Sequence, residues 1–174
     1  MVNELKRLLN KLNLPANIHN AYEFKTKGDM VADCKNIDVF KRGYLNTCSC
    51  AKRGTRKDIR ENPSAKNCGV CMPCMYRRAA LHRMALDVEP IGTNMLDPDD
   101  QVRSLLKIPD MPAFLSFLKT NLTKSDIEGN LLCNGSLPLD LIGDYADVVV
   151  GVRKEIMRWI IDKGGIAIKK ELGL

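Results

Sequence analysis

The residues of this sequence that are best suited to chemistry are its cysteines. Seven occur in 174 residues, and five of them lie between positions 48 and 74, whereas Cys34 and Cys133 stand alone. Without a secretory signal, a disulfide framework is not expected, so clustered thiols indicate a bound metal ion. Cys68, Cys71 and Cys74 are spaced by three residues, and one upstream cysteine would complete the four sulfur ligands of a structural zinc site.

The three closely spaced cysteines need a turn in the chain to reach one ion. Along a straight helix each step of three residues rotates the side chain by about 300°, so the sulfur atoms would diverge. Gly69 and Pro73 break the helix here, and Cys74 would then lie at the N-terminus of the next helix, where the helix dipole favours a thiolate. A closed set of four thiolates leaves no position for water, so we expect a structural rather than a catalytic zinc ion.

Spacing alone leaves two points open. Cys48 and Cys50 are both at a workable distance to be the fourth ligand. An iron–sulfur cluster is the main rival to zinc, because ferredoxins also use Cys-x2-Cys-x2-Cys. The ferredoxin pattern continues with Cys-Pro three residues later, and position 78 here is arginine. We therefore expect zinc.

Positive charge is concentrated around the cysteines. Between Lys41 and Arg83 there are eleven Lys and Arg residues against Asp58 and Glu61, whereas the rest of the chain has sixteen basic and nineteen acidic residues. Such a region attracts phosphates, or it is a solvated face that offsets thiolate charge. The composition is otherwise globular, with 45% apolar and 28% charged residues, and no run is apolar enough for a membrane span. We expect a cytoplasmic protein without membrane contact.

The elements that must position the cysteines are predicted to be helices, and strand signals are weak. A polar, basic loop is predicted at 45–67, a short extended segment at 17–24, and a linker at 89–100. Thr26 and Asp29 have capping-box spacing. In the last helix, one apolar stripe contains Val148, Val149, Val152, Ile156, Trp159 and Ile160. The predicted helices are 2–13, 26–34, 37–42, 74–86, 101–107, 111–121, 124–132 and 144–163, the last ending at Gly164-Gly165.

Two groups of motifs resemble one known family. Thr47-Cys-Ser-Cys50, followed by Cys68-Gly-Val-Cys-Met-Pro-Cys74 and Arg77-Arg-Ala-Ala, is similar to the zinc region of the 7-cyano-7-deazaguanine synthases, the QueC family. It is closer to their QatC relatives in the Qat anti-phage system. Phe24-Lys-Thr-Lys-Gly-Asp-Met30 resembles an upstream segment of the family, with Asp29 in place of Glu. The motifs span residues 22–80 in the family's order.

The resemblance implies a ligand choice, a reaction and a fold. It places the fourth zinc ligand at Cys50, because Cys48 occupies a variable position of the family motif. The implied reaction is the ATP-dependent adenylation of a deazapurine carboxylate, which ammonia converts to an amide and then a nitrile, in queuosine-type nucleoside biosynthesis or anti-phage defence. The implied fold is the C-terminal portion of an α/β PP-loop enzyme, with residues 1–86 as the end of the QueC-like domain, zinc loop 46–75, and residues 87–174 as a helical tail.

The family's phosphate-binding loop, Ser-Gly-Gly-x-Asp-Ser, does not occur in this sequence. The only Gly-Gly pair is Gly164-Gly165, at a predicted helix end, and no Walker-type motif is present. We therefore expect no intact catalytic site and no adenylation by this chain alone. The implied partner is the nucleotide-binding half, from the same gene or a split partner. A homodimer or contacts with other Qat proteins are further expectations.

Five residues outside the cysteines are candidates to lie near substrate or nucleotide. Lys27 and Asp29 match the family segment, although a helix start with a capping acid explains them equally well. Thr47 belongs to the zinc motif, and Arg77 and Arg78 could hold phosphate or the loop backbone. The alternative to the enzyme is a free-standing zinc module that binds a protein or, less favoured, nucleic acid through its basic residues. A packing or surface role is expected for His82, and a core role for Trp159.

Overall fold

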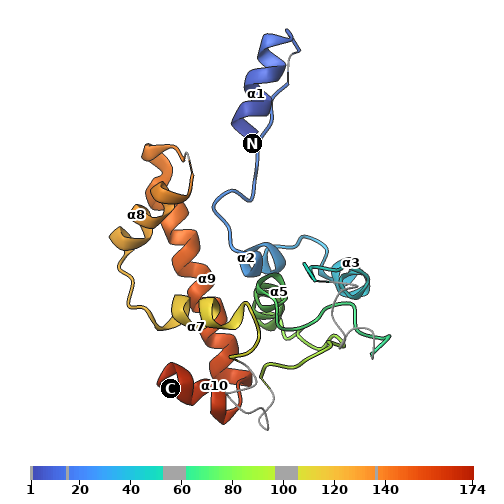
Figure 1. Cartoon of the computed structure of the whole chain (residues 1–174). Coiled ribbons are helices and arrows are strands. Elements are labelled where there is room, and N and C mark those ends of the chain that lie inside the picture. Colours follow the sequence, from blue (N-terminus) through green and yellow to red (C-terminus); the bar gives the residue numbers. More distant parts are fainter. Residues whose placement is uncertain (1, 15, 53–61, 97–105, 136) are drawn as a thin grey trace.

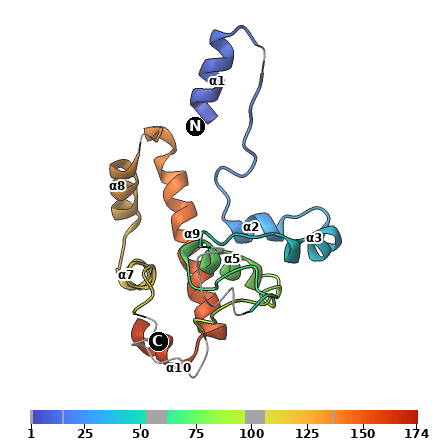
Figure 2. The ribbon, with the colours of Figure 1, turned by 45° about the vertical axis from the view of Figure 1, so that its right-hand side comes forward.

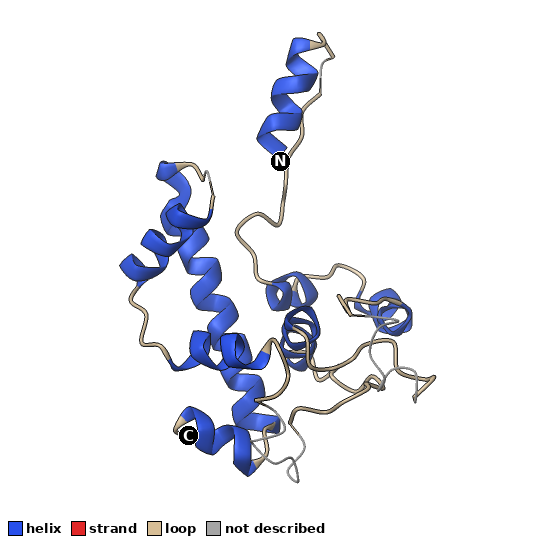
Figure 3. Ribbon diagram, in the orientation of Figure 1, coloured by secondary structure: helices blue, strands red, loops and turns tan. Residues whose placement is uncertain are grey.

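The computed structural model of the chain describes residues 2–14, 16–52, 62–96, 106–135 and 137–174, and they form a helical protein (Figures 1 and 3). No strand occurs in these ranges; the one β-type contact is an isolated parallel bridge between Asn67 and Ile91. The α-helices are α1 (Val2–Lys11), α2 (Lys27–Ala32), α3 (Ile37–Gly43), α5 (Met72–His82), α7 (Met111–Lys119), α8 (Lys124–Asn134), α9 (Ile142–Lys163) and α10 (Ile166–Leu172). Two 3-10 turns are η1 (Tyr44–Asn46) and η2 (Leu139–Leu141).

Helix α9 is the longest described element, with 22 residues, and the other C-terminal helices pack along it (Figures 1 and 2). Its predicted apolar stripe is only partly buried. Ile156, Trp159 and Ile160 are fully buried, whereas the valines at 148, 149 and 152 are half-buried. Helix α8 pairs with α9, and α5 packs against α9, where Arg78 meets Trp159 and His82 meets Asp162.

One hydrophobic core joins the cysteine region to the C-terminal helices. It contains Cys68, Cys71 and Cys74 together with Phe114 of α7, Trp159 of α9 and neighbouring apolar side chains. The predicted division at residues 86 and 87 remains a prediction, but the two parts share this core. Burial of cysteines within an aliphatic core removes their sulfur atoms from water, which favours a ligand role over reactive thiol chemistry.

Helix α2 begins as predicted and is fastened to α9. The Thr26 hydroxyl accepts a hydrogen bond from the Asp29 backbone N–H, and the Asp29 carboxylate accepts one from the Thr26 N–H, which completes the capping box. Glu155 of α9 accepts hydrogen bonds from the Thr26 hydroxyl and the Gly28 N–H. A Cβ added to Gly28 would lie 2.2 Å from the Glu155 carboxylate, so a larger residue here would displace that carboxylate.

The helices differ from the predicted boundaries in a few places. Helix α5 begins at Met72, with Pro73 in its first turn, and ends at His82 rather than at residue 86. Residues 16–24 form no strand, and residues 21–24 are a turn. Helix α10 was not predicted. The predicted helix at 101–107 falls largely outside the described residues, as does much of the loop at 45–67.

Candidate metal centre and the adjoining pocket

The four predicted ligands come together in space. The Sγ atoms of Cys50, Cys68, Cys71 and Cys74 all lie within 4.8 Å of one another. Cys71 and Cys74 are 3.3 Å apart between sulfur atoms, and Cys68 and Cys74 are 3.9 Å apart. Zinc–sulfur bonds of about 2.3 Å in a tetrahedron require sulfur separations of about 3.8 Å. The described arrangement is therefore close to a four-thiolate metal site, and this group could hold a metal ion.

The turn between Cys68 and Cys71 depends on Gly69. Its φ is +83°, and a Cβ at this position would lie 2.1 Å from the carbonyl oxygen of Thr93. The Thr93 N–H in turn donates to the Cys68 carbonyl at 2.9 Å, and the Gly92 N–H donates to the Asn67 carbonyl at 2.9 Å. Thus residues 91–93, which we predicted to be part of a linker, pack against the turn Cys68–Cys71, which we call the metal turn.

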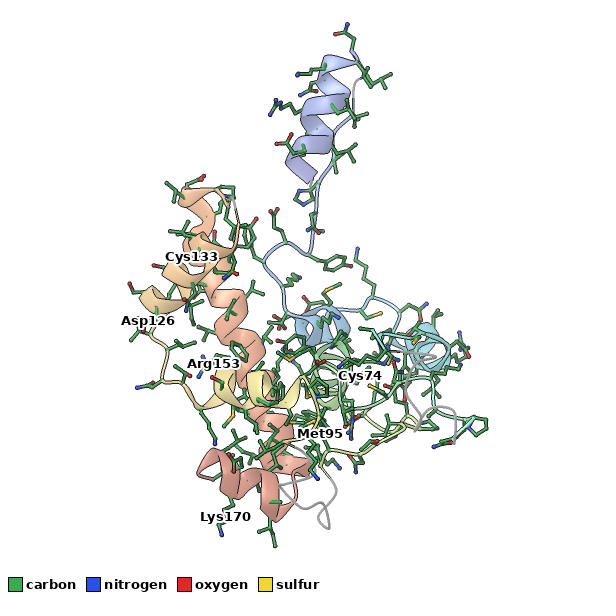
Figure 4. All side chains as sticks on the ribbon, viewed as in Figure 1. Cys74, Met95, Asp126, Cys133, Arg153 and Lys170 are labelled. Carbon is green, nitrogen blue, oxygen red and sulfur yellow. The ribbon has the colours of Figure 1, made fainter. Side chains whose placement is uncertain are left out.

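The third and fourth ligands are positioned by the start of α5. Cys71 is the N-cap residue and Cys74 is the third residue of the helix (Figure 4). The positive end of the helix dipole stabilises negative sulfur at both positions. The Met72 N–H donates to Asp110 at 3.1 Å, which ties the helix start to the residue preceding α7.

The pKa shifts of the clustered cysteine thiols are those expected of a site that binds a cation. A hydrogen bond from Cys74, despite burial, lowers the pKa of Cys68 to about 5, with help from the backbone N–H groups of Val70 and Cys71. The same bond to Cys68, together with burial, raises the pKa of Cys74. Burial also raises the pKa of Cys50. The protein alone thus ionises one sulfur readily, and a soft divalent cation would supply the charge that the other thiolates require.

The structure brings Cys50, and not Cys48, into the cluster. The Cys48 side chain is exposed, and its sulfur donates to the Lys66 carbonyl at 3.2 Å. Asn67, which directly precedes the metal turn and is 1% exposed, accepts a hydrogen bond from the Ser49 N–H at 3.1 Å. This amide fastens the Cys50 segment to the turn, a role that sequence reasoning missed because its partner is 18 residues away.

Arg77 fastens the same segment to α5. Its guanidinium makes two bonds to Glu89, at 2.7 and 3.0 Å, and donates to the Tyr44 carbonyl at 2.8 Å and to the Thr47 hydroxyl at 2.9 Å. Its side chain is 10% exposed and that of Glu89 is 4% exposed. Of the two roles predicted for Arg77, the contact with loop backbone is the one that the structure displays.

Arg78 is directed into the core on the other side of α5. It pairs with Asp87 at 2.9 Å, donates to Asn94 at 2.9 Å, and lies 4.9 Å from the centre of the Trp159 ring. The Trp159 indole N–H donates to the second Asp87 oxygen at 2.8 Å. Trp159 is thus a core residue, as predicted, and it also completes the hydrogen bonding of a buried carboxylate.

Three predicted substrate-proximal residues line one pocket of about 550 Å³. Lys27 enters it from α2, Thr47 from the segment before Cys50, and Arg77 from α5. Phe40 and Tyr44 form one wall, with their rings stacked at a centroid distance of 5.7 Å. The pocket borders the segment that leads to Cys50, because Thr47 and Ser49 line it.

The remaining candidates lie elsewhere. Asp29 lines a different pocket of about 320 Å³, where it pairs with Arg83, the C-cap residue of α5. Burial opposes ionisation of Asp29, but hydrogen bonds from Arg83 and Thr26 prevail and lower its pKa. His82 pairs with Asp162 at 2.8 Å and takes no part in the cysteine cluster.

Comparison with known proteins assigns no family to the chain: no family model, no curated protein and no solved structure matches it. None of the described helices has both the length and the apolar character that a membrane crossing requires.

Proposed function

We propose that this chain is the zinc-containing C-terminal portion of an ATP-dependent enzyme similar to QueC and QatC. In this proposal a structural zinc ion holds the wall of a pocket for a deazapurine-type carboxylate. The observation that carries it is the convergence of four cysteine sulfur atoms beside a pocket that contains Lys27 and Thr47. The motif order that resembles the family supplies the reaction.

The proposed zinc ion would be bound by Cys50, Cys68, Cys71 and Cys74. Three of these ligands are fully buried and Cys50 is half-buried, so the set leaves no room for a water ligand. The ion would therefore stabilise the fold and fix the segment 44–50 that borders the pocket. Iron–sulfur chemistry stays the alternative for the same ligands.

The pocket suits a flat ring that carries an acid group. The Phe40 and Tyr44 rings offer an aromatic surface, and the Lys27 ammonium, which has no partner among the described residues, would pair with a carboxylate. Arg77 would act indirectly, by holding Thr47 and the Tyr44 backbone in place. Adenylation would need a nucleotide-binding part with the phosphate loop, encoded in the same gene or separately.

The alternative function, a module that binds through its basic region, has less support. Of the basic residues described between 41 and 83, four are paired with acidic residues, namely Lys52, Arg77, Arg78 and Arg83. Lys66 donates to the Leu45 carbonyl. Cations that already have protein partners contribute little to counterion release on nucleic acid.

The metal assignment is tested by element analysis of the purified chain and by two cysteine variants. We expect one zinc ion per chain. Cys50→Ser should remove zinc and most of the folding stability, because structural zinc contributes roughly 10–16 kcal/mol in small domains. Cys48→Ser should leave zinc content and the thermal transition unchanged. Iron in the preparation, or the reverse order of the two variants, would contradict the assignment.

The pocket assignment is tested by calorimetric titration with a 7-deazapurine carboxylate. Binding should be lost in Lys27→Met and weakened about tenfold in Thr47→Val. Lys163→Met, a lysine at the far end of α9, is the matched control and should bind normally. Equal binding by all four proteins would rule out this pocket. The chain alone should not convert ATP to AMP, and turnover would contradict the need for a nucleotide-binding part.

A further inference from the structure

A second pocket, of about 380 Å³, is lined by residues of α2, α5, α7 and α9. Helices α2, α5 and α9 contact one another (Figures 1 and 2), and α7 adds Phe117 to the lining. We call it the valine pocket, because Val148, Val149 and Val152 of α9 line it. Pockets for small molecules usually have volumes of roughly 300–1,000 Å³, so this one is large enough for a ligand.

The lining of the valine pocket is mainly apolar and is incompletely covered. The three valines, Phe117 and Tyr76 are all half-buried, whereas Ala79 and Ile156, which also line the pocket, are buried. This is the part of the predicted α9 stripe that the described residues leave half-exposed. A ligand that covered it would bind roughly fourfold more tightly for each CH₂ group that it buried there.

The polar groups of the valine pocket suit an anion. Its two cationic side chains are Lys25 and Lys27. Lys25 pairs with Asp33 at 2.5 Å, whereas the Lys27 ammonium has no partner among the described residues. The Tyr76 hydroxyl likewise has no hydrogen-bond partner in the described part of the chain. Lys27 is therefore available to pair with a carboxylate, and Tyr76 offers a further donor.

The single carboxylate that lines the valine pocket is already engaged by the protein. Glu155 accepts hydrogen bonds from the Thr26 hydroxyl and from the Gly28 N–H, the second at 3.3 Å. The Arg83 guanidinium lies 3.8 Å from the same carboxylate. Burial also raises the pKa of Glu155, which reduces its negative charge. A basic partner would thus meet two lysines and no free acid here, whereas an acidic ligand would meet an unpaired ammonium.

We propose that the valine pocket binds a small aliphatic monocarboxylate, whose chain covers the valines and whose carboxylate pairs with Lys27. A cavity of about 150 Å³ binds benzene, so a pocket of about 380 Å³ accommodates a chain of roughly eight to ten carbon atoms. The inference does not rest on the proposed enzyme. The valine pocket and the pocket of Phe40 and Tyr44 share Lys27 and no other lining residue.

Calorimetric titration of the full chain with sodium octanoate, below the concentration at which it forms micelles, tests the proposal. Octanoate should bind roughly fifteenfold more tightly than hexanoate, because it buries two more CH₂ groups. Lys27→Met should weaken octanoate binding about fivefold, since one exposed ion pair is lost. The neutral probe 1-octanol should bind wild type and Lys27→Met equally, because it carries no charge for Lys27 to pair with.

Matched substitutions on α9 locate the site. Val148→Asp places a carboxylate in the pocket and should abolish octanoate binding. Val150→Asp is the control on the same helix, because Val150 lines neither pocket, and it should bind normally. Val148→Thr keeps the side-chain shape and should bind octanoate about fivefold more weakly, which tests the site even if Val148→Asp does not fold.

A variant of the other pocket separates this proposal from the proposed enzyme. Thr47→Val should bind octanoate as wild type does, because Thr47 lines only the pocket of Phe40 and Tyr44. Three results would overturn the inference: no octanoate binding by wild type, equal affinity for hexanoate and octanoate, or octanoate binding that Val148→Thr leaves unchanged. None of them bears on the binding of a deazapurine carboxylate.

Discussion

The region around α5 and the N-terminal region offer the same kind of helix but bury it differently. Helix α5 has 11 residues, and six of them are buried, including Arg78. Helix α3 has seven residues and none of them is buried, although it contains Val39 and Phe40. An amphipathic pattern is thus sufficient to predict a helix but not to predict what covers it. The cysteine region has its cover within the chain, whereas the N-terminal helices expose apolar side chains.

Among variants that leave the four cysteines in place, the largest effect should come from breaking the buried Arg78–Asp87 ion pair of α5. Arg78→Met leaves the Asp87 carboxylate buried with one donor fewer, and this should lower the free energy of unfolding by about 3–5 kcal/mol. Arg83→Met, at the C-cap of the same helix, is the matched control, because the Arg83 side chain is 40% exposed, and it should cost at most about 1 kcal/mol. Urea unfolding of the zinc-loaded proteins measures both. Equal losses of stability in the two variants would show that the buried Arg78–Asp87 pair contributes no more than the exposed Arg83–Asp29 pair.

The metal turn should be nearly as sensitive at Gly69. Gly69→Ala combines a left-handed backbone, which costs roughly 1–2 kcal/mol, with a clash against the Thr93 carbonyl. At Gly173 φ is +74° and a Cβ would meet nothing within 4 Å, so Gly173→Ala reports the backbone cost alone. Thermal unfolding and zinc content should show that only the first variant weakens the metal site. Similar melting temperatures for Gly69→Ala and Gly173→Ala would mean that the backbone of residues 91–93 shifts at little cost in free energy.

Glu155 of α9, which accepts hydrogen bonds from Thr26 and Gly28 at the start of α2, should make the stability of the folded chain depend on pH. Burial raises the pKa of Glu155 above its ordinary 4.5. The unfolded chain therefore ionises first, and stability falls as pH rises from about 4.5 through the folded pKa. Glu155→Gln removes this dependence, so the variant should gain stability relative to wild type as pH rises across that interval. A difference that stays constant with pH would show that Glu155 ionises freely in the folded chain.

The smallest effect should come from the exposed apolar residues of the N-terminal region. Val39→Ser replaces a side chain that is 52% exposed and should change the free energy of unfolding by less than about 0.5 kcal/mol. Met30→Ser, at 39% exposure, should behave in the same way. A loss above about 1 kcal/mol in either variant would indicate that this region is covered in solution.

Local signals in the sequence accounted for most of the described helices and for the grouping of the cysteines. The capping box at Thr26 and the proline in the first turn of α5 fix helix starts through contacts within four residues. The spacing of Cys68, Cys71 and Cys74 likewise reports a local turn. Helix α10 was missed because it has only seven residues and follows a Gly-Gly pair that reads as an end.

Long-range pairing set the limit of what the sequence could predict. Nothing in the local pattern indicates that Arg77 bonds Glu89 or that Glu155 bonds Thr26, which is 129 positions away. Spacing alone did not choose between Cys48 and Cys50 either. The resemblance to the family motif favoured Cys50, and the fold brings Cys50 into the cluster while Cys48 bonds the Lys66 carbonyl. Which side chains face a pocket depends on such pairings, so three of the five candidates came together and two did not.

The shared core also has a consequence for biosynthesis. The four cysteines leave the ribosome well before Trp159 and Ile160, the α9 residues that pack in the same core. At synthesis rates of about 5–20 residues per second, roughly 4–17 seconds separate Cys74 from Ile160. During that interval the nascent thiols are open to solvent, to metal carriers and to oxidants. For a metal held by this cluster, slower synthesis of α9 would lengthen the time in which the cysteines could capture the ion before the core closes.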